Sequence, residues 1–190
     1  LELTHDDMMR RQLCRLGDVA MSDLLRGQGN RDELARIGQV VNDWPGKVRY
    51  IHCPGATASW IASVIRREAV VRQGGLFIVD YLHKIMPEAT VGRQGRTDEM
   101  HLATSVEILK TAAELASVPV ILLSQINTDY ADRGSKGPRL VMTDLRGSGQ
   151  ISEKANMLLM LWNESVHAQD DSINIVEAHI AKNTFGGQGK

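Results

Sequence analysis

The chain has 190 residues, of which 43% are hydrophobic and 24% are charged; these values are typical of a globular domain and exclude a disordered or fibrous protein. Its 22 lysines and arginines nearly balance its 23 aspartates and glutamates, which excludes a strongly basic protein but leaves room for a local groove that binds phosphates. The 2 cysteines form no CxxC motif and the histidines no HExxH motif, so neither a disulfide framework nor a metal site of these residues is indicated. The sequence also shows no apolar run of the roughly 20 residues that cross a bilayer and no signal-peptide pattern, so we expect a cytoplasmic protein.

The N-terminal part of the sequence predicts two helices. Thr4 and Asp7 can form a capping box, and apolar residues continue at roughly helical spacing to about Leu25. Asn30 can cap a second, shorter helix that reaches Val41.

Strands and helices alternate in the middle of the chain. We predict, in order, a strand at 48–53, an amphipathic helix of about 15 residues that ends before Gly74, a strand at 76–79, a helix at 98–117 and a strand at 118–123. The run 76–79 is continuously apolar, as expected of a central parallel strand that is covered on both faces.

The C-terminal part changes this pattern. A polar, glycine-rich loop at 130–143 is followed by strands at 157–162 and 173–182, separated by an acidic turn. The fold class that follows is α/β, a mostly parallel sheet flanked by helices, with an antiparallel or hairpin element at its C-terminal edge.

Polar residues follow two of the predicted parallel strands. In open α/β sheets, ligands bind beyond the carboxyl ends of the strands. Asp80 therefore has the position of a Walker B aspartate, which takes Mg²⁺ beside bound phosphates, and Gln125 can contact a γ-phosphate or its attacking water. Glu2 can act as general base for water. The alternatives are plain: an aspartate can simply cap a loop, a glutamine at a strand end is ordinary, and Glu2 can complement a helix dipole.

The segment 143–150, TDLRGSGQ, is a candidate phosphate-binding loop. Its glycines let backbone N–H groups approach an oxyanion, and Arg146 adds a charge-assisted contact. No aromatic residue lies in it, which favours tracking of a nucleic-acid backbone over base stacking. A short glycine-rich segment of this kind can also be no more than a turn.

Taken together, the motifs GLFIVDYLHKI at 75–85, VPVILLSQIN at 118–127, TDLRGSGQISEKANMLLMLWN at 143–163 and HIAKNTFGGQGK at 179–190, with Glu2 in LELT, occur in the order seen in DnaB-type replicative helicases. The chain resembles the C-terminal RecA-like motor domain of that family across essentially all 190 residues, as one domain.

The resemblance implies a role for each matching residue. Glu2 is similar to the glutamate that polarises water, Asp80 to the Mg²⁺-linked acid, and Gln125 to the γ-phosphate sensor. Lys182 matches a basic residue that reaches the nucleotide site of a neighbouring subunit. Arg146, Gly147 and Gly149 resemble the loop that holds single-stranded DNA. The implied cofactors are ATP and Mg²⁺, and the implied partners are single-stranded DNA, further copies in a ring, as in a hexamer, and a primase or helicase loader.

Two features depart from the family pattern. The chain has no GxxxxGK[ST] phosphate-binding loop, so we expect a fragment that starts after it and binds nucleotide poorly by itself. Thr184 stands where the family places an arginine finger, a group worth about 10³ to 10⁵ in rate. These departures keep two alternatives open: a RecA-like recombinase-type ATPase, or a degenerate helicase-like binding module without turnover.

Overall fold

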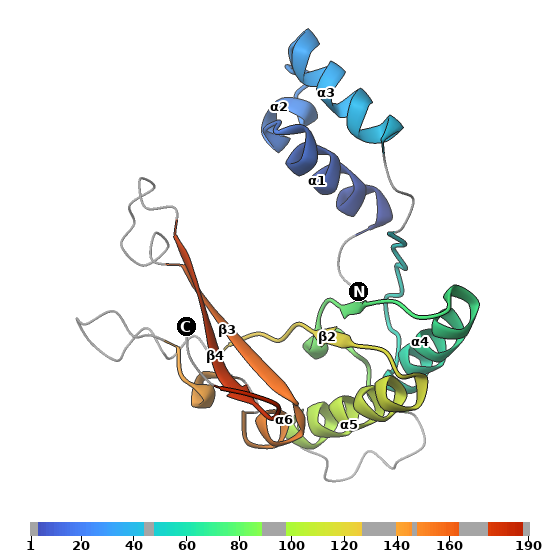
Figure 1. Ribbon diagram of the computed structural model, residues 1–190, viewed down its shortest axis with the longest axis vertical. Coiled ribbons are helices and arrows are strands. Elements are labelled where there is room, and N and C mark those ends of the chain that lie inside the picture. Colours follow the sequence, from blue (N-terminus) through green and yellow to red (C-terminus); the bar gives the residue numbers. More distant parts are fainter. Residues whose placement is uncertain are drawn as a thin grey trace, which may run out of the picture. The chain divides into compact units, whose positions relative to one another are not determined.

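The computed structural model describes residues 4–43, 48–88, 98–126, 140–145, 148–163 and 175–187. The chain divides into two compact units, Leu1–Pro54 and Gly55–Lys190, and each is described by itself (Figure 1). In the described residues, no helix has both the length and the apolar character to cross a membrane.

The first unit contains helices α1 (His5–Gly17), α2 (Met21–Leu25) and α3 (Arg31–Asn42). The predicted capping boxes of α1 and α3 are both present. The prediction of one helix running to Leu25 is wrong. Asp18 adopts the left-handed conformation with φ 51°, and the N–H of Val19 donates to the Cys14 carbonyl at 2.9 Å, which ends α1. Arg36 of α3 donates to the Gly17 carbonyl at 2.8 Å and so caps this end of α1.

The strand predicted at 48–53 is absent, because those residues form no strand in the structure. A strand needs a hydrogen-bonded neighbour as well as apolar residues, and no described segment pairs with 48–53. Val48 and Ile51 accordingly stay 48% and 38% exposed. Parallel pairing starts only later, at the bridge between Thr57 and Met86.

The second unit has a core built on two long helices, α4 (Ala58–Arg72) and α5 (Asp98–Ala116), which pack against each other. Both helices confirm the sequence prediction. Ile65 of α4 and Leu109 of α5 are each 2% exposed, so the apolar stripes meet in this core. Gln73 ends α4 in the left-handed conformation, with φ 58°.

Strands β1 (Phe77–Val79) and β2 (Val120–Leu122) pair in parallel, as predicted (Figure 1). Val79 is buried, but Ile78 is 60% exposed, so the prediction that this strand is covered on both faces is wrong for the described residues. The reason is that helices pack on one face only of a pair whose side chains alternate in direction.

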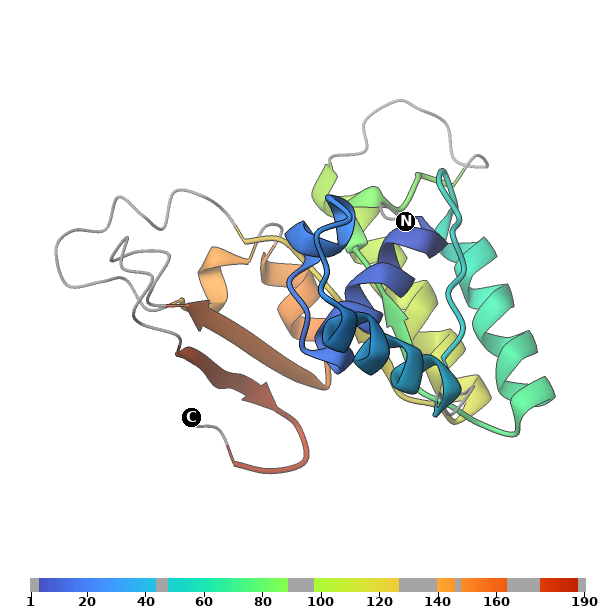
Figure 2. The same cartoon turned by 90° about the horizontal axis from the view of Figure 1, so that it is seen from above.

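Strands β3 (Met157–Asn163) and β4 (Val176–Asn183) form the antiparallel element that the sequence predicts. Figure 2 shows this pair as a ribbon of its own, and in the described residues each strand pair is a separate two-stranded sheet. The structure is thus α/β, with a parallel and an antiparallel pair.

Short helices precede β3, where the sequence analysis expected a loop at 143–150. The 3-10 helix η3 covers Met142–Asp144, and the α-helix α6 covers Ser148–Lys154. Ile151 is buried, which explains why this polar segment folds as a helix against α5. Of the glycine-rich loop predicted before it, residues 130–139 lie outside the described residues.

Candidate functional site

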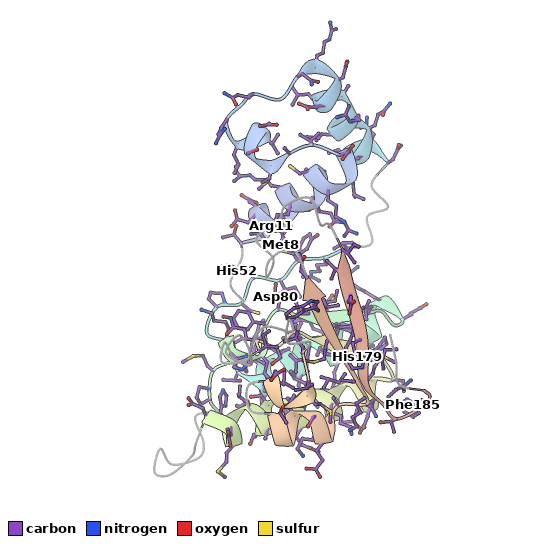
Figure 3. The ribbon with its side chains drawn as sticks, turned by 90° about the vertical axis from the view of Figure 1, so that its left-hand side faces the viewer. Met8, Arg11, His52, Asp80, His179 and Phe185 are labelled. Atoms are coloured by element: carbon purple, nitrogen blue, oxygen red, sulfur yellow. The ribbon has the colours of Figure 1, made fainter. Side chains whose placement is uncertain are left out.

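The carboxyl ends of β1 and β2 lie side by side. Phe77 pairs with Val120 and Val79 with Leu122, and the N–H of Leu123 donates to the Val79 carbonyl at 3.0 Å. Asp80 follows β1 directly, and Gln125 lies shortly after β2, so both residues stand at the same edge of the parallel pair. Both side chains are exposed, and Asp80 is labelled in Figure 3.

The backbone after Asp80 is fixed by the core. Leu82 is 0% exposed, and its N–H donates to the Leu123 carbonyl at 2.8 Å. Leu82 begins the 3-10 helix η1 (Leu82–Lys84). The anchored backbone on either side holds the Asp80 carboxylate at the strand end.

The donor set at this edge fits a magnesium ion that is shared with phosphates. Mg²⁺ in phosphate sites is bound by one or two carboxylates, with waters and phosphate oxygens completing the shell. Asp80 supplies one exposed carboxylate. In the described part of the chain, no group of three or more His, Cys, Asp or Glu residues forms a metal site made of protein ligands alone. The edge therefore suits a metal ion that arrives with nucleotide.

The second predicted site, the DNA-binding segment, is linked to this edge by the backbone. Ile126, directly after Gln125, forms an isolated antiparallel bridge with Leu145. Leu145 is 4% exposed and immediately precedes Arg146 in the sequence. A displacement of the backbone at Gln125 would thus reach the start of the candidate DNA-binding segment through one bridge.

The residues of that segment are only partly described. Arg146 and Gly147 lie outside the described residues, as does Glu2 at the start of the chain. Gly149 lies in the first turn of α6, where a Cβ atom would meet nothing within 4 Å. Its surface is thus open to a ligand.

Lys182 lies on β4, opposite Leu158 of β3. Its ammonium group donates to the backbone carbonyls of Ser152 and Glu153, each at 2.8 Å. These carbonyls belong to the last turn of α6. The sequence analysis missed this contact because it missed α6, although Lys154 near a helix end and the apolar Ile151 one turn earlier were available as signals.

Thr184 follows β4 in a turn that the structure holds in place. Its N–H donates to the Asn156 carbonyl at 2.9 Å, and its side chain is exposed. The side chain of Asn183 accepts from the N–H of Phe185 at 3.1 Å, and Phe185 is 83% exposed (Figure 3). The position of the expected arginine finger is therefore at the surface.

A cavity of about 250 Å³ opens elsewhere in this unit, between α4 and α5. Arg66 and Glu107 are among its lining residues, and none of the predicted site residues lies there. The candidate site consequently rests on the strand edge and not on this cavity.

The sequence was compared with known protein families and proteins. The profile of the family described as "DnaB-like helicase C terminal domain" matches residues 1–190. A "Probable plasmid replicative DNA helicase" of Chlamydia psittaci is 31% identical over 190 residues, which are 98% of this chain and 40% of that protein. The "Replicative DNA helicase DnaC" of Bacillus subtilis (strain 168) is 27% identical over 191 residues, 100% of this chain and 41% of that protein.

Solved structures show the same fold. One, described as "The Structure Of A DnaB-Like Replicative Helicase And Its Interactions With Primase", superposes with a TM-score of 0.85 at 21% identity over 99% of this chain and 45% of that chain. Another, described as an ATPase domain, also gives a TM-score of 0.85 at 21% identity and is covered to 66%. The chain thus spans about two fifths of the length of the curated relatives it matches.

Proposed function

The chain belongs to the family of DnaB-like helicase C-terminal domains, and we propose that it is the motor domain of a replicative DNA helicase, which uses ATP hydrolysis to move along single-stranded DNA and separate the duplex. The observation that carries the proposal is the adjacency of β1 and β2, which puts Asp80 and Gln125 at one sheet edge. We treat residues 1–190 as one motor domain, since the family profile extends over both units.

In the proposed nucleotide site, each residue acts on the terminal phosphate or on water. Mg²⁺, when bound, would neutralise charge on the β- and γ-phosphates. Asp80 would hold that ion through water. Glu2 would accept a proton from the attacking water, and Gln125 would donate its amide N–H to a γ-phosphate oxygen. After hydrolysis and phosphate release, Gln125 loses that partner.

Hydrolysis would be transmitted to DNA through the bridge between Ile126 and Leu145. The change at Gln125 shifts the adjacent Ile126, and Leu145 carries the shift to Arg146. Arg146, Gly147 and Gly149 would hold successive phosphates of the single strand by charge and by close backbone approach. Such binding has no sequence preference, as a replicative motor requires.

The proposal includes a ring of identical subunits, a hexamer as the family resemblance implies, with Lys182 facing the nucleotide of the next subunit. A head-to-tail interface whose rotation closes produces a ring. A primase or a helicase loader would be a further partner of the assembled ring.

The proposal is tested by ATP hydrolysis and strand separation with the complete protein. We expect single-stranded DNA of any sequence to stimulate hydrolysis, and a forked duplex to be separated only when ATP and Mg²⁺ are both present. Hydrolysis that ignores DNA would support a different ATPase. DNA binding without any hydrolysis would support the non-catalytic module, which Thr184 at the position of the expected arginine finger favours.

A further inference from the structure

Lys182 makes a contact that its proposed role toward a neighbouring subunit does not require. Its ammonium group donates to two carbonyls of α6 in the same chain, those of Ser152 and Glu153, at 2.8 Å each. An ammonium group has three N–H donors, so this contact uses two of them. The Lys182 side chain is half-buried, which holds the charged group against α6.

The contact satisfies a specific need of α6. The last carbonyls of a helix have no partner within the helix, and a cation at this end interacts favourably with the helix dipole. Helix α6 has 7 residues, too few for a helix to be stable alone in water. Its position therefore depends on the groups that hold it from outside.

Two contacts from other elements hold the carboxyl end of α6. Lys182 holds it from β4, and Glu107 of α5 forms an ion pair with Lys154. The buried Ile151 adds an apolar contact. At its other end, α6 begins at Ser148, directly after Arg146 and Gly147 in the sequence, and its first turn contains Gly149.

We propose that Lys182 is a positioning residue for DNA binding in its own subunit: by anchoring the carboxyl end of α6, it fixes the helix from which the proposed DNA-binding segment extends. This inference rests on the proposed function, because it assumes that the segment 146–149 contacts DNA. It differs from the role toward a neighbouring nucleotide, since it acts within one chain and without nucleotide.

The test measures binding of a fluorescent single-stranded oligothymidylate to the complete protein with no nucleotide present. For Lys182→Met we expect affinity to fall about tenfold, as for loss of charge-assisted hydrogen bonds that fix a binding element. Lys182→Arg should restore most of the affinity, because a guanidinium can donate to both carbonyls. The matched control is Lys110→Met, which removes the same charge from α5 and should change affinity little.

Amide hydrogen exchange separates positioning from general unfolding. In Lys182→Met, exchange should accelerate in α6 while the buried parts of α4 and α5 keep their protection. If Lys182→Met fails to fold, Lys154→Met releases α6 on the α5 side and should lower DNA affinity in the same way.

Two negative results have different meanings. If the unsubstituted protein binds no single-stranded DNA, the proposed function fails and the inference falls with it. If that protein binds DNA and Lys182→Met binds it equally well without nucleotide, the inference alone is overturned, and Lys182 acts only toward a neighbouring subunit.

Discussion

The N–H of Leu123 donates a 3.0 Å hydrogen bond to the carbonyl of Val79. This bond extends the pairing of β1 and β2 to the last residue before Asp80. The backbone on which the candidate nucleotide site depends is thus held by main-chain contacts, and substitutions of the exposed Asp80 and Gln125 side chains should leave it intact.

Replacing Asp80 tests the metal-linked role. We expect Asp80→Asn to lower DNA-stimulated ATP hydrolysis on the order of 10²-fold or more, the size of losing one electrostatic contact in a phosphate site. The thermal unfolding midpoint should change little, because the side chain is exposed. The control is Glu114→Gln, which neutralises an exposed carboxylate on α5. Equal hydrolysis by Asp80→Asn and the control would remove Asp80 from the site.

Restoring an arginine at position 184 tests whether hydrolysis is limited by its absence. We expect Thr184→Arg to raise the hydrolysis rate of the assembled protein at least about tenfold, toward the 10³ to 10⁵ that an arginine finger supplies. The backbone N–H that Thr184 donates to Asn156 is retained in this variant. Thr184→Gln, which is uncharged, should give no increase. An unchanged rate for Thr184→Arg would show that another group already supplies this charge.

The buried Leu82 tests the anchor behind the strand edge. Leu82 is 0% exposed, so Leu82→Ala should lower the free energy of unfolding by about 2 to 5 kcal/mol. Leu115 on α5 is 69% exposed, and Leu115→Ala should cost less than about 0.5 kcal/mol. Denaturant unfolding of both variants measures the difference. A small loss for Leu82→Ala would contradict the described packing.

The ion pair between α5 and α6 predicts a pH dependence. The Lys154 ammonium, by its hydrogen bond first and its charge second, lowers the pKa of Glu107 below its ordinary value of 4.5. Because the folded-state pKa is lowered, the pair stabilises the protein above about pH 4.5, and this stabilisation is lost as the pH falls below it through the folded-state pKa.

The measurement compares the unsubstituted protein with Glu107→Gln. The variant should be less stable at neutral pH, and the difference should close at about pH 3, where the carboxyl is protonated in both states. Glu114→Gln serves again as the control. A difference that stays constant between the two pH values would show that the pair contributes nothing through its charge.

Much of the fold could be predicted because local patterns and tertiary contacts agree. The capping residues Thr4 and Asn30 mark helix starts in the sequence, and the apolar spacing in 58–72 describes the face that α4 buries. The strand ends at Asp80 and Gln125 follow from short apolar runs.

The errors have a common physical cause, dependence on a distant partner. Residues 48–53 are apolar enough for a strand but have no described neighbour to pair with. The break at Asp18 depends on a left-handed backbone and on Arg36 from another helix. Helix α6 exists because Lys182 and Glu107, far away in the sequence, hold its end. None of these contacts is visible in a local pattern.

The most direct measurement is a structure of the complete protein with Mg²⁺ and a non-hydrolysable ATP analogue. The account predicts that the γ-phosphate lies at the carboxyl ends of β1 and β2, with the Gln125 amide about 3 Å from a phosphate oxygen and the Asp80 carboxylate linked to Mg²⁺ through water. A nucleotide bound away from this edge, with neither residue near its phosphates, would contradict the account.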